Sequence, residues 1–238
     1  MSATPRGAPR IAIPPSGLAR RVTGGLGVAF GVVLVASVAT GAGVPGSDAT
    51  GSAVELFAID NYHRLQVSLV LAVLAWFLFA LFAGVLASRI RRVDDATGEV
   101  WGPGFAVGAA GAAALALAAV AVQGTYQGLS HAGAAPPQIL ELFRISHALD
   151  AVSGAVLAAA LVAVGISAVL NGTIPAALGG LALVVAVLAG VGAGGAATAR
   201  TSLGTVSMIT ALALAVWAGA VGVWMLAWPE APSAQAAP

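Results

Sequence analysis

The sequence predicts an all-α protein, a polytopic transmembrane bundle of about six helices with both termini in the cytoplasm. Two observations predict this fold class. The 238 residues are 59% hydrophobic and only 8% charged, whereas soluble domains carry roughly 25% charged residues. The apolar residues also fall in long runs that are separated by short polar segments. A chain of this composition cannot cover a globular surface with polar groups, so several of its segments must lie in lipid.

The clearest apolar run covers residues 65–87 and contains no charged residue. As an α-helix this run is roughly 34 Å long, which is enough to cross a hydrocarbon core of roughly 30 Å. Arg89, Arg91 and Arg92 follow it directly. The run therefore defines one membrane span that ends in a basic segment.

The other segments divide the chain into a bundle and two tails. Residues 1–21 combine Pro, Gly and Arg without an acidic residue, which predicts a disordered basic cytoplasmic tail. Residues 229–238 form a short, disordered C-terminal tail rich in Pro and Ala. The bundle covers residues 22–228, with spans expected at about 22–44, 62–88, 103–123, 147–170, 176–197 and 205–228. The first run can also be read as a cleaved signal sequence, but its length favours a retained span.

Two of the helices are expected to project from the outer face of the membrane. Ser52 and Glu55 have the spacing of a capping box, which predicts that the second helix begins near Ser52 and runs to about Arg89. The fourth helix is expected to begin after Pro137 and to continue into its span. Tyr126, Gln127 and His131 precede that helix and are expected on a loop surface.

The distribution of arginine predicts the orientation. Six spans place both termini on one side of the membrane. That side would carry Arg6, Arg10, Arg20, Arg21, Arg89, Arg91 and Arg92, and the other side would carry Arg64, Arg144 and Arg200. Because cytoplasmic loops carry the excess of basic residues, we expect a multi-pass protein of the plasma membrane with cytoplasmic termini.

Composition also limits the chemistry and the partners. The chain has no Cys, which excludes disulfides, thiolate metal sites and cysteine nucleophiles. A net charge of +1 gives no case for nucleic-acid binding, so the expected partner is the lipid bilayer. Three GxxxG pairs allow close helix contact, either within the chain or in a homodimer; they are Gly27/Gly31, Gly104/Gly108 and Gly190/Gly194. A protein of the cell envelope is the other partner considered.

Candidate site residues gather at the outer ends of the second and fourth helices. On one helical face Asp60, His63 and Arg64 stand at i, i+3 and i+4. A second group recurs every three residues, namely Glu141, Arg144, His147 and Asp150. If the two helices pack together, Asp60, His63, His147 and Asp150 converge, and these are ligand types for a divalent metal. No HExxH or comparable motif accompanies them, so no catalytic residue and no definite cofactor is predicted.

Three functions remain open at this point. The first is a non-enzymatic membrane protein whose outer polar cluster clamps the helices or contacts a partner, with ion pairs Glu141–Arg144 and Asp60–Arg64. The second is a carrier of a small molecule or lipid with an outward-facing pocket near Asp150, because a carboxylate inside a span is costly and requires a partner. The third is a metal- or haem-binding membrane protein that uses His63 and His147.

The later part of the chain resembles a known group of sequences. The fourth span opens with His147-Ala-Leu-Asp150, and it ends in the turn Leu170-Asn-Gly-Thr-Ile-Pro175. With the arginine-ended second span, this pattern resembles the uncharacterised multi-span bacterial membrane proteins that are grouped as a domain of unknown function and are typical of GC-rich bacteria. The resemblance implies a membrane location and a helical bundle, and it implies no catalytic residue.

Overall fold

The computed structural model describes residues 17–46, 48–97, 99–197 and 203–227, and every regular element in these ranges is an α-helix. The helices are α1 (Gly17–Thr40), α2 (Gly51–Asp60), α3 (Tyr62–Thr97), α4 (Trp101–His131), α5 (Pro136–Asn171), α6 (Ala176–Ala197) and α7 (Leu203–Ala227). Within the described residues, all of these except α2 are long and apolar enough to cross a membrane, which makes six spans. The predicted all-α bundle of six spans is confirmed, and the chain is a multi-span integral membrane protein. The predicted tails lie almost entirely outside the described residues.

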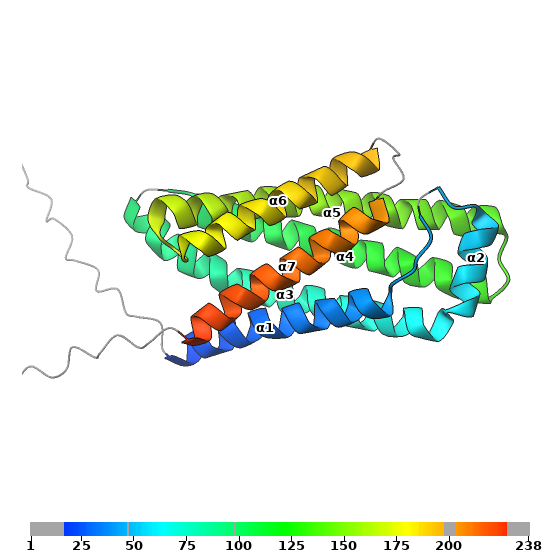
Figure 1. Cartoon of the computed structure of the whole chain (residues 1–238), viewed down its shortest axis with the longest axis horizontal. Coiled ribbons are helices and arrows are strands. Elements are labelled where there is room, and N and C mark those ends of the chain that lie inside the picture. Colours follow the sequence, from blue (N-terminus) through cyan, green and yellow to red (C-terminus); the bar gives the residue numbers. More distant parts are fainter. Residues whose placement is uncertain (1–16, 47, 98, 198–202, 228–238) are drawn as a thin grey trace, which may run out of the picture.

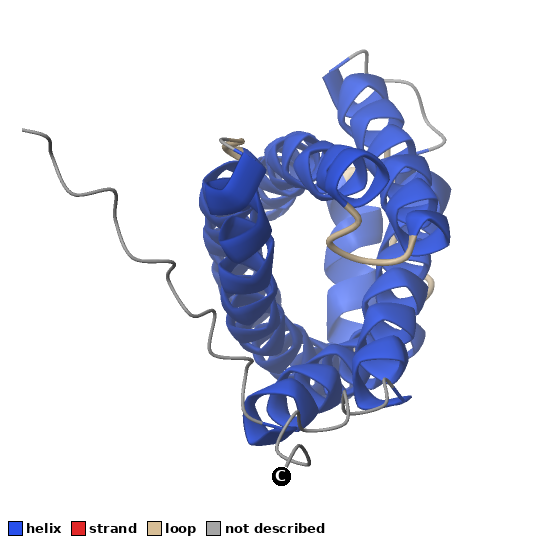
Figure 2. Cartoon of the chain, turned by 90° about the vertical axis from the view of Figure 1, so that its left-hand side faces the viewer, coloured by secondary structure: helices blue, strands red, loops and turns tan. Residues whose placement is uncertain are grey.

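The six spans form a closed ring. Each span packs against the span that precedes it in the chain, and α7 returns to pack against α1. Figure 2 looks along the long axis of the molecule and shows the helices in this ring. The start of α1 and the end of α7 lie together at one end of the bundle (Figure 1), which is called the terminal end below. The opposite end carries α2 and is called the α2 end.

Aromatic side chains fill the centre of the ring. Phe30 of α1 and Phe79 of α3 lie with their ring centroids 5.1 Å apart. Phe82 of α3 meets Trp217 of α7 edge to face, with 6.0 Å between the centroids. All four side chains are fully buried. The indole Nε1 of Trp217 also donates a hydrogen bond to the carbonyl of Leu178 at 3.1 Å, so the aromatic core joins α6 to α7 and α3.

The outer surface of the ring is apolar, as contact with lipid requires. Large aliphatic and aromatic side chains are exposed on every span, among them Val32, Val70, Phe77, Val107, Val162, Val187 and Val216. A soluble monomer rarely exposes a continuous apolar surface of this extent. Because the driving force for burial between helices is weak in lipid, the small residues of the helix contacts hold the ring by close packing instead.

Helix length divides the bundle into two parts. The helices α3 and α5 have 36 residues each and α4 has 31, whereas roughly 20 residues cross the hydrocarbon core. These three helices project beyond the shorter α1, α6 and α7 at the α2 end (Figure 1). We call α2 and the projecting parts of α3, α4 and α5 the α2 cap. Its own small core consists of Val54, Ala58, Tyr126, Ile139 and Phe143.

The second predicted helix begins near Ser52 as expected, but its continuity and its capping residue are wrong. The structure breaks it at Asn61 into α2 and α3, and α2 lies across the other helices (Figure 1). Thr50, not Ser52, caps α2, because its Oγ1 accepts a hydrogen bond from the N–H of Ala53 at 3.3 Å. The break lets α2 turn over α4 and α5, and the side chain of Asn61 bonds the carbonyl of Phe57 at 3.0 Å.

The third predicted helix ends too early. The structure continues α4 to His131, so Tyr126 and Gln127 are helical and buried rather than on a loop surface. Only His131 of that group is exposed. The reason is tertiary, because the polar end of α4 packs beneath α2 and against α5 inside the α2 cap.

Glycines allow the closest helix contacts inside the ring. A Cβ atom on Gly27 would lie 2.7 Å from the carbonyl oxygen of Ala218 on α7, and one on Gly31 would lie 2.8 Å from that of Ala215. A Cβ atom on Gly108 would lie 2.8 Å from the Cβ of Ala160 on α5. These GxxxG residues therefore serve packing within the chain, as one of the two readings of the sequence predicts.

Candidate functional site

All seven candidate site residues lie at the α2 end. Asp60 ends α2, His63 and Arg64 begin α3, and Glu141, Arg144, His147 and Asp150 lie on α5. Their side chains are exposed except that of His147, which is half-buried. The sequence therefore locates the polar end of the bundle correctly. It does not follow that the seven side chains contact one another.

The four expected metal ligands do not come together. The helix α4 packs extensively against both α3 and α5, whereas α3 and α5 contact each other much less. His63 lies edge-on to Tyr62, with 5.6 Å between the ring centroids, while His147 packs against Phe143 at 4.2 Å. In the described ranges, no three His, Asp or Glu side chains are close enough to hold a metal ion. The expected convergence of the four residues into a metal site is wrong. The helix α4 lies between α3, which carries His63, and α5, and Asp60 joins no such group although its helix α2 contacts α5.

Arg64 makes contacts that the sequence does not predict. Its Nη2 donates a hydrogen bond to the carbonyl of Ala42 at 2.6 Å, and its guanidinium lies 5.9 Å from the ring centroid of Phe57. The break at Asn61 places Asp60 on a different helix from Arg64, so the i, i+4 geometry of a single helix does not exist there. Arg64 thus ties the start of α3 to the segment that follows α1.

The Glu141–Arg144 ion pair also does not form. Both side chains are exposed on the projecting part of α5, and the described residues include no ion pair between them. Exposed pairs of this kind contribute about 0–1 kcal/mol, so the lack of this pair costs the fold little.

Asp150 has a neighbour on α4. Its Oδ2 accepts a hydrogen bond from Nε2 of Gln123 at 3.3 Å, and the carboxylate is exposed. A carboxylate offers about four acceptor positions, and this long bond occupies one of them. Gln123 thus orients the carboxyl group of Asp150.

His147 lies one helical turn before Asp150 on α5. Its Nδ1 lies 3.0 Å from the carbonyl oxygen of Phe143. Because a carbonyl can only accept a hydrogen bond, Nδ1 carries the proton in this arrangement and Nε2 of the neutral ring is an acceptor. Residues at i and i+3 are neighbours on a helix surface, so His147 and Asp150 lie on the same side of α5.

Two further polar pairs near this end were missed in the sequence. Ser37 of α1 and Ser68 of α3 each donate a hydrogen bond to the other's carbonyl at 3.0 Å. The amide Nε2 of Gln66 donates to Oε1 of Gln127 at 3.4 Å, which joins α3 to α4. These four polar residues stand near the ends of apolar runs. The sequence does not indicate which helices become neighbours, so it does not predict the two pairs.

A buried carboxylate at the terminal end was also missed. Asp94, in the last turns of α3, is only 1% exposed. Its Oδ2 accepts a short hydrogen bond from the N–H of Gly102 in the first turn of α4. Its Oδ1 lies 3.5 Å from the side-chain amide of Asn171 at the end of α5. Because Val100, the residue before α4, makes no side-chain cap, Asp94 supplies that cap from α3.

Arg89 connects the same end to the last span. Its Nε donates a hydrogen bond to the carbonyl of Thr173, in the turn after α5, at 3.2 Å. Its guanidinium lies over the ring of Trp224 on α7, 5.0 Å from the centroid. The interaction of a cation with an aromatic face is favourable at this distance. Arg89 and Asp94 together hold α3, α4, α5 and α7 at the terminal end.

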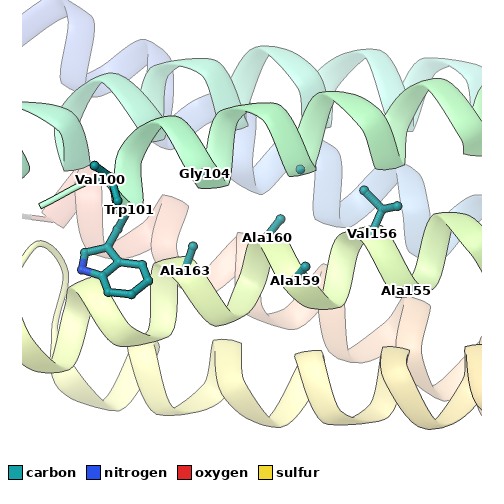
Figure 3. Close-up of a pocket in the computed structure, with 9 residues that line it drawn as sticks. Val100, Trp101, Gly104, Ala155, Val156, Ala159, Ala160 and Ala163 are labelled. Carbon is teal, nitrogen blue, oxygen red and sulfur yellow. The ribbon is translucent and has the colours of Figure 1, made fainter.

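An apolar groove lies on the surface between α4 and α5, near the terminal end (Figure 3). Its volume is about 560 Å³. The residues that line it are Gly, Ala, Val and one Trp, namely Val100, Trp101, Gly104, Gly108, Ala155, Val156, Ala159, Ala160 and Ala163. The indole Nε1 of Trp101 is buried and has no hydrogen-bond partner among the described residues.

Comparison of the chain with protein-family models, with curated proteins and with solved structures finds no match. The resemblance to uncharacterised bacterial membrane proteins therefore stays a prediction.

Proposed function

We propose that this protein is a non-enzymatic carrier or receptor of the plasma membrane that binds a small organic cation at Asp150. The observation that carries the proposal is the exposed carboxylate of Asp150, which a single long hydrogen bond from Gln123 orients. A charged group on a membrane helix is costly, and such groups often mark a binding site or a solute path.

The depth of Asp150 supports a site that solutes can reach. Roughly 20 helical residues cross the hydrocarbon core, so a span of α5 that ends at Asn171 begins near Val152. Asp150 then stands where the hydrocarbon gives way to the α2 cap. The arginine distribution supports a cytoplasmic terminal end, which places the α2 cap and Asp150 on the outer face.

The chemistry of the site favours a donor of hydrogen bonds with a positive charge. Asp150 contributes a carboxyl acceptor at Oδ2, and His147 contributes a neutral acceptor at Nε2. A protonated amine satisfies both, because an ammonium group has three donors and no acceptor. A divalent metal is less well supported, because no third His, Asp or Glu of the described residues joins the pair.

The earlier alternative, a clamp between helices at Asp150, has less support. A single bond of 3.3 Å between exposed groups contributes little to stability. Asp94 is the buried carboxylate that joins helices in this fold. We therefore expect Asp150→Asn to change the free energy of unfolding by less than about 1 kcal/mol.

A ligand-induced thermal shift tests the proposal. n-Butylamine, which is protonated at neutral pH, is expected to raise the melting temperature of the detergent-purified protein, and the uncharged n-butanol is not. A ligand at one hundred times its Kd stabilises the folded state by about 2.7 kcal/mol. Asp150→Asn should abolish the shift, and His147→Ala should weaken it.

Glu141→Gln is the matched control, because it removes an exposed carboxylate from the same helix without touching the pair. The shift should persist in this variant. Equal shifts in the Asp150→Asn and Glu141→Gln proteins, or equal shifts with the amine and the alcohol, would contradict the proposal.

A further inference from the structure

We infer that the groove between α4 and α5 binds an anionic phospholipid, with one acyl chain in the groove and its phosphate near Arg91 and Arg92. This site lies at the terminal end, away from Asp150, and does not depend on the function proposed above.

The groove lies within the membrane-crossing part of the bundle. Gly104 and Gly108 belong to the first two turns of the α4 span, and Ala159 and Ala163 belong to the last turns of the α5 span. Because the outer surface of the ring faces lipid at this depth, an acyl chain is the molecule that the groove meets. Its volume of about 560 Å³ falls within the roughly 300–1,000 Å³ of small-ligand sites.

The sequence leaves this space open for a physical reason. Gly108 and Ala160 bring the two helices into close contact, since a Cβ atom on Gly108 would lie 2.8 Å from the Cβ of Ala160. Next to this contact, Gly104 has only the Cβ of Ala163 nearby, at 4.0 Å. Apart from Trp101, the walls of the groove carry only Gly, Ala and Val (Figure 3). An acyl chain restores the dispersion contacts that the walls otherwise lack.

Two arginines near the start of α4 are the basis for the choice of head group. Arg91 and Arg92 are exposed at the end of α3. Arg91 lies against the start of α4, since a Cβ atom on Gly102 would lie 2.9 Å from its Cα, and Gly102 adjoins Trp101 of the groove. Arginine is well suited to phosphate, and basic residues between spans on the cytoplasmic side bind anionic head groups.

A second copy of the chain is the other occupant to consider. Two copies with the same orientation that meet at this groove in a two-fold dimer would place identical surfaces against each other. Arg91 and Arg92 of both copies would then come close, and like charges oppose such an arrangement. The charge of these two arginines thus favours an anionic lipid over a second copy.

Native mass spectrometry of the detergent-purified full chain tests this inference. Phosphatidylglycerol should bind more tightly than phosphatidylcholine with the same two acyl chains. Replacing Arg91 and Arg92 together by Gln should remove this preference, with a loss of about fivefold in affinity for each Arg. Ala159→Phe, which places a ring in the groove, should weaken both lipids.

Ala110→Phe is the matched control, because Ala110 is an exposed residue of α4 that does not line the groove. It should leave lipid binding unchanged, and an unaltered melting temperature of the detergent-purified variants checks that all of them fold. Equal binding of the two lipids by the unmodified chain would overturn the inference. A dimer that Ala159→Phe converts to a monomer, with lipid binding unchanged, would assign the groove to a second copy instead.

Discussion

Replacing Asp94 by Ala is expected to lower the free energy of unfolding in detergent by about 2–3 kcal/mol. Asp94 is buried, and its carboxylate accepts hydrogen bonds from the N–H of Gly102 and from the amide of Asn171. Removing the carboxylate leaves the N–H of Gly102 buried without an acceptor, and such a group costs the full desolvation energy. It also removes the only side chain that caps α4 among those described.

Unfolding by SDS in mixed micelles, followed by tryptophan fluorescence, measures this loss. Asp95→Ala is the matched control, because Asp95 is the next residue in the chain and is exposed. The control should stay within about 0.5 kcal/mol of the unmodified protein. Asp94→Asn keeps an acceptor oxygen and should be less harmful than Asp94→Ala. Equal stabilities for the two Asp→Ala variants would show that the buried carboxylate does not hold the terminal end.

Gly222→Ala is expected to destabilise the bundle by about 1–3 kcal/mol or more, because it opens the contact that closes the ring. A Cβ atom at this position would lie 2.6 Å from the carbonyl oxygen of Gly24 and 2.8 Å from the backbone nitrogen of Val28. Both are main-chain atoms of α1, so no side-chain rotation relieves the overlap. The helices α1 and α7 must move apart.

The control for this prediction lies one turn earlier on the same helix. A Cβ atom on Gly219 meets nothing within 4 Å, so Gly219→Ala should be neutral or stabilising, since Ala favours a helix by about 1 kcal/mol over Gly. Thermal unfolding of the two variants in the same detergent decides the matter. If both substitutions gave the same shift in melting temperature, the close approach of α7 to α1 would not limit stability.

Several residues show how far local patterns predict this fold. The run from 65 to 87 predicts the central part of α3 because a long uncharged segment has no alternative to lipid. The turn at Gly172 and Pro175 separates α5 from α6 as expected, since Gly172 has a φ of 63° and caps α5. The predicted boundaries at the α2 end are less accurate. Thr50 rather than Ser52 caps α2, and α4 continues past Gln123 to His131.

In the candidate site, too, local patterns predict the position of the residues but not their contacts. The sequence places Asp60, His63, His147 and Asp150 at one end of the bundle, because each stands at the polar end of an apolar run. It does not predict that Gln123 would be the partner of Asp150. The order of helices around the ring sets that pairing, and helical periodicity gives no information about the order.

Composition and the length of apolar runs by themselves determined that this chain is a membrane protein with six spans, because a long uncharged run can cross lipid as a helix that satisfies its own backbone. The tertiary structure alone decided which polar groups meet. The helix α4 lies between α3, which carries His63, and α5, which carries His147. The buried side chain of Asp94 reaches from α3 to the start of α4 and the end of α5. Contacts between segments distant in the chain depend on how helices pack, and packing depends on shape at each crossing rather than on any local pattern.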